Sequence, residues 1–144
     1  MDFGTYLLCI RLQEPVDPVV GSLGTVSFPA GWYLYVGSAL GPGGFSRVSR
    51  HRELARGERS TVHWHIDHLL TAELSRLSGT YYFPDMAVEC ATASRFDGEV
   101  VTGFGATDCR CSSHLAHFSG RCEFSRWIDR LIQSGLHPNQ PDAT

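Results

Sequence analysis

The sequence contains no lysine, and all 12 of its basic residues are arginine. Because 15 residues are acidic, the formal net charge is −3. The chain therefore lacks the overall basic excess that is typical of nucleic-acid-binding proteins, and any anion site must be a local patch. Arginine can bind phosphate through two hydrogen bonds, but we attribute the absence of lysine to coding composition or habitat rather than to function.

Long apolar runs and a secretory leader are also missing. No apolar stretch approaches the roughly 20 residues that span a bilayer, and residues 1–6 have neither a basic flank nor an apolar core. The five cysteines form an odd set without even spacing, which argues against a secreted disulfide scaffold. We therefore expect reduced thiols, a cytoplasmic location and no membrane contact.

The length and composition fit one domain. A chain of 144 residues buries roughly two-thirds of the surface of its unfolded state. The apolar fraction of 42% and the charged fraction of 19% are ordinary for a globular protein. We expect a single domain over residues 1–134, followed by a flexible C-terminal tail over residues 135–144.

Three short strands are predicted near the N-terminus. Residues 5–12 and 32–37 are rich in alternating aromatic and aliphatic side chains, and residues 19–28 read as a strand interrupted by glycines. Tight turns between these segments indicate an antiparallel meander. In the third strand, Tyr33 and Tyr35 should share the face opposite Leu34, so that one face packs while the other can carry function.

Helical spacing follows these strands. Residues 45–56 are predicted to form a helix that ends at Gly57, and a second helix is predicted from residue 61 to residue 77. Asp85 can cap a third helix over residues 86–96. The remaining expected elements are short strands at 81–83 and 100–104, a polar loop at 105–114, and a last helix at 125–132. These elements predict an α/β (α+β) domain in which a small, mainly antiparallel sheet is flanked by helices.

Several polar motifs lie at the ends of these elements. Gly4-Thr5-Tyr6 opens the first strand, and Tyr35-Val36-Gly37-Ser38-Ala39 closes the third. The motifs that follow are Arg47 with His51, Trp64-His65-Ile66-Asp67, Glu89-Cys90, and Asp108-Cys109-Arg110-Cys111-Ser112-Ser113-His114. Together and in this order, they resemble the GIY-YIG nuclease superfamily, most closely its small stand-alone, Uri-type endonuclease-like branch.

The resemblance extends from Gly4 to about Phe118. It implies a GIY-YIG-like fold with extra strands, and a divalent-metal-dependent endonuclease that hydrolyses nucleic-acid phosphodiester bonds, with DNA favoured over RNA. Residues 16–29 separate the two tyrosine motifs and are predicted to add a strand between them. The tyrosines can still meet if the strands at 5–12 and 32–37 are neighbours in the sheet.

The residue types suit this reaction, which needs a positioned water, a proton acceptor and neutralised phosphoryl oxygens. The resemblance implies that Glu89 holds one Mg²⁺ or Mn²⁺ and that Arg47 grips the scissile phosphate. Tyr6 and Tyr35 would lie near the attacking water. A phenol of reference pKa about 10 is a poor base unless cations favour its phenolate, so His51 is an alternative acceptor. The predicted substrate-binding residues are Gly37, Ser38, Arg50, His65, Asp108 and His114.

Other interpretations of the same residues stay open. The tyrosines can be packing residues, and Glu89 can be a solvated helix residue. A solvent-exposed helix face, instead of a phosphate-binding patch, can account for the arginines at 47, 50, 52, 56 and 59. The alternative function is a non-catalytic nucleic-acid-binding module on the same fold, because no separate DNA-binding domain is evident. Either function is compatible with a protein partner that supplies targeting.

Zinc is a further alternative, raised by seven cysteine and histidine residues: His63, His65, His68, Cys109, Cys111, His114 and Cys122. Zinc prefers four such ligands in tetrahedral geometry, but the Cys-x-Cys-x-x-His segment at 109–114 has no matching half with familiar spacing. Structural zinc is therefore not expected. Nor is a cysteine nucleophile, because nothing places a base beside a thiol. Asp108 and His114 are instead expected at the rim of the cleft, with a purely structural loop as the alternative.

Overall fold

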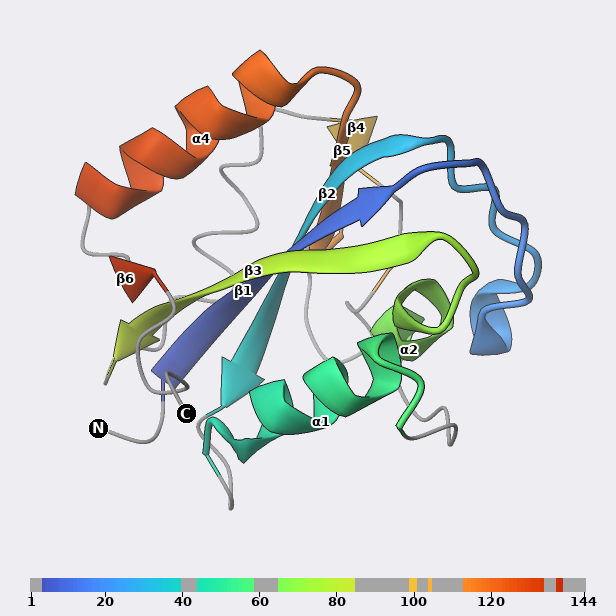
Figure 1. Cartoon of the computed structure of the whole chain (residues 1–144), viewed down its shortest axis with the longest axis horizontal. Coiled ribbons are helices and arrows are strands. Elements are labelled where there is room, and N and C mark those ends of the chain that lie inside the picture. Colours follow the sequence, from blue (N-terminus) through green and yellow to red (C-terminus); the bar gives the residue numbers. More distant parts are fainter. Residues whose placement is uncertain are drawn as a thin grey trace.

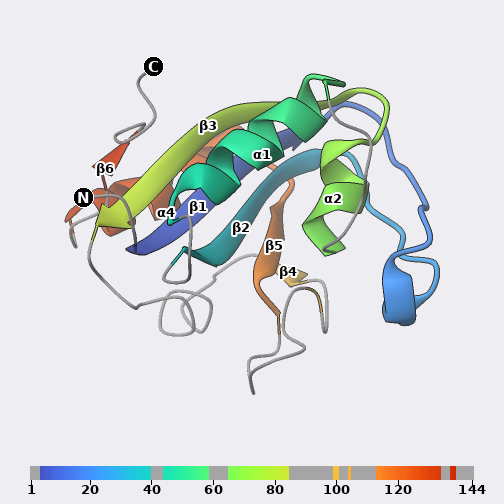
Figure 2. The same ribbon diagram turned by 90° about the horizontal axis from the view of Figure 1, so that it is seen from below.

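The computed structural model describes residues 4–39, 44–58, 65–84, 99–100, 104, 113–133 and 137–138. In this part of the chain, an antiparallel sheet has helices on both of its faces (Figure 1). Helices α1 (Ser46–Ala55) and α2 (His65–Leu70) cover one face, and α4 (Arg121–Gln133) covers the other (Figure 2). The arrangement confirms the predicted α/β (α+β) fold with a small antiparallel sheet flanked by helices.

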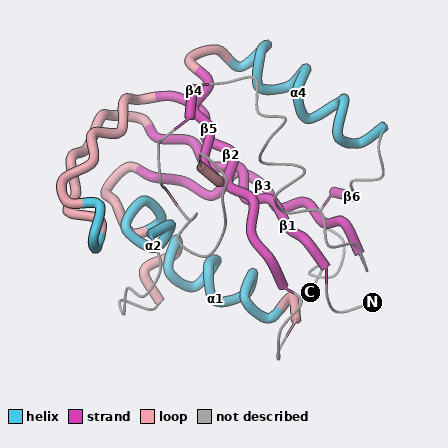
Figure 3. The backbone as a smooth tube through the Cα atoms, turned by 180° about the vertical axis from the view of Figure 1, so that it is seen from behind, coloured by secondary structure: helices cyan, strands magenta, loops and turns pink. Residues whose placement is uncertain are grey.

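The described strands form one six-stranded sheet in the order β4-β5-β2-β1-β3-β6. Their bounds are β1 Gly4–Leu12, β2 Gly31–Ala39, β3 Ser75–Pro84, β4 Glu99–Val100, β5 Leu115–Phe118 and β6 His137–Pro138. The long strand β1 lies between β2 and β3 and pairs with both in antiparallel register (Figure 3). The predicted strands at 5–12 and 32–37 are therefore confirmed, and they are direct neighbours.

Residues 13–30 form a side lobe instead of the predicted strand at 19–28, which is wrong. The lobe is held by two isolated bridges and contains one turn of 3₁₀-helix, η1, at Gly21–Leu23. Gly21 and Gly24 have φ angles of 47° and 73°, which lie outside the strand region and turn the chain back on itself. The expected three-strand meander is thus replaced by direct pairing of β1 with β2, and the lobe projects beyond them (Figure 1).

Helix α1 agrees with the predicted helix at 45–56, and Gly57 follows it with a φ of 77°, as expected for a helix end. The predicted last helix at 125–132 is confirmed as α4, which starts earlier, at Arg121. Within the described part of the chain, no helix has both the length and the apolar character needed to cross a membrane.

The predicted helix at 61–77 is wrong over its second half. Helix α2 ends at Leu70, and Leu74 adopts a left-handed φ of 62° that interrupts any helix. From Ser75 onward the chain pairs with β1, with one bulge opposite the Cys9/Ile10 step. Pairing along the whole of β3 satisfies the backbone in the sheet, and this tertiary context overrides the local helical spacing.

The predicted strand at 81–83 is confirmed as the end of β3. The strand expected at 100–104 is confirmed only at Val100, which belongs to β4 (Glu99–Val100). Phe104 lies in a turn, and residues 101–103 lie outside the described residues. The predicted helix at 86–96 also lies outside them.

The expected flexible tail at 135–144 contains one paired segment. His137 and Pro138 form β6, opposite Tyr82 and Tyr81 of β3. The flexibility of the tail stays a prediction.

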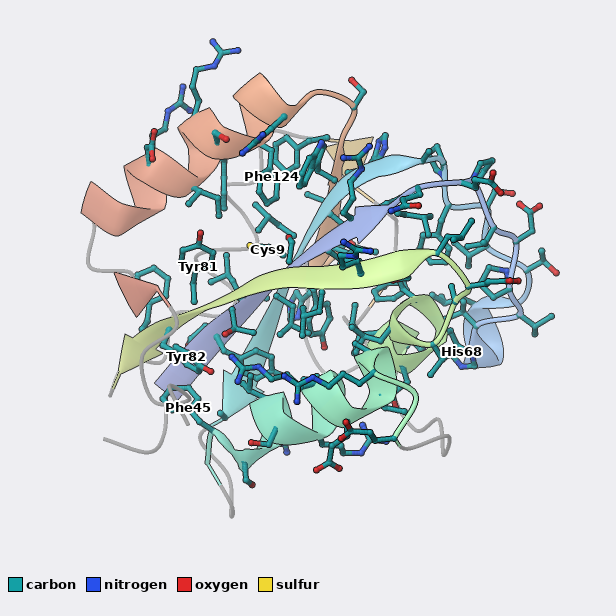
Figure 4. All side chains as sticks on the ribbon, viewed as in Figure 1. Cys9, Phe45, His68, Tyr81, Tyr82 and Phe124 are labelled. Atoms are coloured by element: carbon teal, nitrogen blue, oxygen red, sulfur yellow. The ribbon has the colours of Figure 1, made fainter. Side chains whose placement is uncertain are left out.

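Side-chain alternation along β1 and β2 divides the core into two layers. The layer under α1 includes Tyr6, Leu8, Tyr33, Tyr35, Val48 and Leu54, and the layer under α4 includes Leu7, Cys9, Leu34, Val36, Phe124 and Trp127. Figure 4 shows Phe45 and Tyr82 on the α1 side, and Cys9, Tyr81 and Phe124 on the α4 side. Tyr33 and Tyr35 share a face as predicted, but both faces of the sheet are packed, so the expected open working face is absent from the described part of the sheet.

Candidate functional site

A buried hydrogen bond joins β1 to α1. The Tyr6 hydroxyl oxygen lies 2.8 Å from His51 Nε2, and Tyr6 and His51 are only 2% and 1% exposed. Burial lowers the pKa of His51 to about 4, while Asp67 acts to raise it and Arg50 and Arg47 act to lower it further. The imidazole is therefore neutral at pH 7, and its Nε2 can accept the Tyr6 proton when the ring proton is on Nδ1.

The Tyr35 ring completes this cluster. Its centroid lies 6.4 Å from that of Tyr6 and 6.5 Å from that of His51. The register of β1 and β2 places Leu8 opposite Tyr35 and Gly37 opposite Tyr6, so both tyrosines leave the sheet on the side of α1. Three of the predicted catalytic residues thus come together from β1, β2 and α1.

Gly37 lies under the Tyr6 ring. A Cβ atom added at position 37 would come within 2.5 Å of the Tyr6 hydroxyl oxygen, closer than real Cβ contacts. The strand therefore needs glycine there so that the ring can cross the backbone. This packing explains the residue without a ligand, and the expected contact between Gly37 and substrate stays a prediction.

Arg47 joins the start of α1 to the end of β2. Its guanidinium donates a hydrogen bond to the Ser38 carbonyl oxygen at 2.9 Å. Arg47 is half-buried, and with Ser46, Ser49, Arg50 and Glu53 it lines an open depression of about 390 Å³ on the outer side of α1. The predicted phosphate-binding arginine is thus open to solvent in part and lies one turn of α1 before the buried His51.

Arg50 forms an ion pair inside the protein. Its two terminal nitrogens donate to Asp67 Oδ1 and Oδ2 at 3.1 and 3.0 Å, and the Asp67 side chain is fully buried. A buried carboxylate needs such a partner, because an unpaired charge in the interior is costly. Arg50, which was predicted to bind substrate, is therefore engaged in neutralising Asp67.

Asp67 is the residue that the sequence interpretation missed. In the sequence it is the last residue of the Trp64-His65-Ile66-Asp67 motif, and its spacing alone predicts no role for it. Its Oδ1 lies 3.9 Å from His51 Nδ1, longer than a hydrogen bond but within the range of a strong charge effect on a buried ring. An acidic residue within an apolar helical segment was the available signal, since such a residue is buried only with a partner.

Phe104 is a shared neighbour of Tyr35, His65 and His114. The Phe104 ring centroid is 6.3 Å from that of Tyr35 and 5.5 Å from that of His65. His114 is buried, and its backbone N–H donates to the Phe104 carbonyl oxygen at 2.8 Å, while its own carbonyl accepts from Val36 N–H at 3.0 Å. Partial burial lowers the pKa of His65. The sequence offered no signal for Phe104.

Two predicted site residues, Glu89 and Asp108, lie outside the described residues, and so does Arg59. Where the structure does describe the chain, no three His, Cys, Asp or Glu side chains are grouped as metal ligands. The Glu89 metal site therefore stays a prediction, as does the absence of structural zinc. Cys9 is a free, buried thiol whose pKa is raised by burial, which suits packing better than nucleophilic attack.

The arginines of α1 are only partly available at the surface. In addition to the contacts of Arg47 and Arg50, Arg52 donates to the Thr80 hydroxyl at 2.9 Å. Arg56 is exposed. The expected basic patch is therefore smaller than the number of arginines in this stretch suggests.

The fold and this cluster define a small α+β domain with a buried tyrosine–histidine pair beside an arginine-bearing helix. A family model described as domain of unknown function DUF123 matches residues 5–136, so the chain belongs to the DUF123 family. The match includes both tyrosine strands, α1, α2 and α4. No curated protein and no solved structure matched the chain.

Proposed function

We propose that this protein is a divalent-metal-dependent endonuclease of the GIY-YIG type that hydrolyses phosphodiester bonds in nucleic acid, DNA in preference to RNA. The observation that carries the proposal is the pairing of β1 with β2, which puts Gly37 under Tyr6 and gathers Tyr6, Tyr35 and His51. A cytoplasmic location belongs to the same proposal.

In the proposed reaction a water oxygen attacks phosphorus, and the bond from phosphorus to the leaving sugar oxygen breaks. As the water loses a proton to the Tyr6 oxygen, the Tyr6 proton moves to His51 Nε2 across the 2.8 Å hydrogen bond. The leaving oxygen takes up a proton from solvent. Neutral His51 is the form that can accept, and Asp67 supports the imidazolium that results. Tyr35 is the alternative hydroxyl, because at 8% exposed it is the more accessible of the two.

Arg47 would neutralise charge on the phosphoryl oxygens, because it is half-buried and lines an open depression that an anion can enter. Glu89 is the residue proposed to hold Mg²⁺ or Mn²⁺. When bound, the cation would stabilise charge on the phosphoryl and leaving oxygens.

A second candidate function is a nucleic-acid-binding module without turnover. The observation that favours it is burial: Tyr6 and His51 are 2% and 1% exposed, so a phosphodiester meets Arg47 before it meets either group. On this proposal the domain binds nucleic acid equally well with and without divalent cation. A protein partner that supplies targeting is compatible with both functions.

The two functions are separated by a cleavage assay on single-stranded, duplex and branched DNA and on RNA, with Mg²⁺ or Mn²⁺ at controlled salt. Wild type is compared with Glu89→Gln and Arg47→Ala. The matched control is Arg76→Ala, which removes the same charge from an exposed position on β3, away from the cluster.

Cleavage by wild type and Arg76→Ala, but not by the other two variants, supports the nuclease. Cleavage that persists in Glu89→Gln and Arg47→Ala, from protein freed of contaminating nuclease, overturns it. Binding without product at any protein concentration favours the binding module instead.

A further inference from the structure

We infer that Asp67 is a positioning residue that fixes the ring proton of His51 on Nδ1, so that Nε2 is left to accept from the Tyr6 hydroxyl. The inference concerns the free protein and goes beyond the proposed function. It rests on the contacts that Asp67 makes with Arg50, Thr71 and His51, and on the hydrogen bond between His51 and Tyr6.

The carboxylate of Asp67 is held in one orientation. Arg50 binds both of its oxygens at 3.1 and 3.0 Å, and such a two-point contact defines the plane of the carboxylate. The backbone is held as well, because the Asp67 carbonyl accepts from the Thr71 N–H and hydroxyl at 3.0 and 2.8 Å. The carboxylate is therefore a fixed negative charge in the interior.

That charge faces one edge of the His51 ring. Oδ1 lies 3.9 Å from Nδ1, and Nε2 on the opposite edge contacts the Tyr6 hydroxyl at 2.8 Å. A proton on Nδ1 points the positive end of an N–H dipole toward the carboxylate. A proton on Nε2 would instead turn the Nδ1 lone pair toward it, which is unfavourable in a buried site. The geometry thus selects one of the two neutral forms of the ring.

Arg50 and His51 are adjacent on α1 yet approach the same side chain of α2. The ion pair therefore helps to set the position of the ring, because it fixes α1 against α2 at this point, while the Asp67 charge sets the ring proton. The contacts thus form one chain that runs from Arg50 through Asp67 and His51 to Tyr6.

The test is the proton position of His51, measured by long-range ¹H–¹⁵N correlation on uniformly labelled full-length protein near pH 7. A protonated ring nitrogen and a bare one differ widely in ¹⁵N shift. His51→Gln identifies the signals, because they vanish in that variant. We expect wild type to carry the proton on Nδ1. In Asp67→Asn the carboxamide can present its N–H₂ group to Nδ1, so we expect the two shifts to exchange.

Arg50→Lys is the matched control. It keeps the Asp67 carboxylate and a positive charge beside it but loses the two-point contact. We therefore expect Arg50→Lys to be less stable than wild type, with the ring proton of His51 still on Nδ1. The proton on Nε2 in wild type, or an unchanged tautomer in folded Asp67→Asn, overturns the inference. If Asp67→Asn does not fold, the wild-type spectrum alone decides. The measurement uses no substrate, so absence of cleavage by wild type would count against the proposed nuclease and leave this inference standing.

Discussion

Gly37 and Tyr6 are opposite each other in the β1–β2 pairing, and the Tyr6 ring fills the space that a side chain at position 37 would need. We therefore expect Gly37→Ala to destabilise the protein by about 1–3 kcal/mol, the usual cost of overpacking. The clash falls on the backbone side of the ring and forces Tyr6 away from His51. The free energy of unfolding in denaturant measures the loss.

Gly79→Ala is the control for that variant. Gly79 is also a strand glycine, but an added Cβ would lie 3.6 Å from the Tyr81 ring, an ordinary contact. Its stability should stay close to that of wild type. Equal losses in both variants would mean that strand glycines here are interchangeable and that the Tyr6 contact has no special importance.

Removing the Tyr6 hydroxyl should cost stability and, under the proposed function, activity. Tyr6→Phe leaves the buried Nε2 of His51 without this contact, which we expect to cost about 1–3 kcal/mol. Tyr33→Phe is a matched change on the same face. Tyr33 is also buried, but it donates to the carbonyl of Pro29, an exposed residue. The group left without this bond thus belongs to a residue at the surface and not to a buried ring, so the cost should be smaller. Paired unfolding and cleavage measurements should find cleavage lost in Tyr6→Phe and kept in Tyr33→Phe.

Much of this cluster was predictable because it depends on local pattern. Alternation placed Tyr33 and Tyr35 on one face, and helical spacing placed Arg47 and His51 one turn apart. What the pattern could not supply was the partner of each group. Asp67 and Phe104 reach the cluster only through tertiary packing, and neither has a local spacing relationship to Tyr6 or Tyr35.

The errors in the fold have a similar cause. The segment at 71–77 has the composition of a helix, yet Leu74 turns left-handed and the chain joins the sheet. A glycine would have marked that turn in the sequence, whereas leucine gave no such signal. In the lobe at 13–30, the sequence pattern predicts a strand that Gly21 and Gly24 merely interrupt, whereas in the structure these glycines form turns that prevent a strand.

The left-handed Leu74 gives a direct stability prediction. Leu74→Gly should stabilise the protein by about 1 kcal/mol or less, because relief of the φ strain exceeds the extra entropy of glycine in the unfolded chain. Leu74 is 47% exposed, so the loss of its partial burial offsets some of this gain. Val19→Gly is the control, as Val19 is also an exposed aliphatic residue but has no positive φ, and that variant should lose stability. Thermal unfolding shows whether each variant is more or less stable than wild type.

His51 should make stability depend on pH. The groups that face it are Asp67 of α2, Arg50 and Arg47 of its own helix, and the hydroxyl-bearing rings of β1 and β2. Its pKa of about 4 in the folded protein lies below the ordinary value of 6.5. Between these two values the unfolded chain binds more protons than the folded one, so stability falls as the pH falls from 6.5 to 4. The total loss from this group is on the order of 3 kcal/mol.

His51→Gln isolates that contribution, because carboxylates elsewhere also titrate at low pH. The glutamine amide keeps a polar group beside Tyr6 but does not titrate. We expect the unfolding free energy of wild type, relative to that of His51→Gln, to fall steadily from pH 6.5 to 4 and then to stay constant at lower pH. The same slope in both proteins would show that His51 keeps an ordinary pKa in the folded state. The imidazole would then still be mostly neutral at pH 7, as an ordinary histidine is, but its neutrality would no longer follow from its burial.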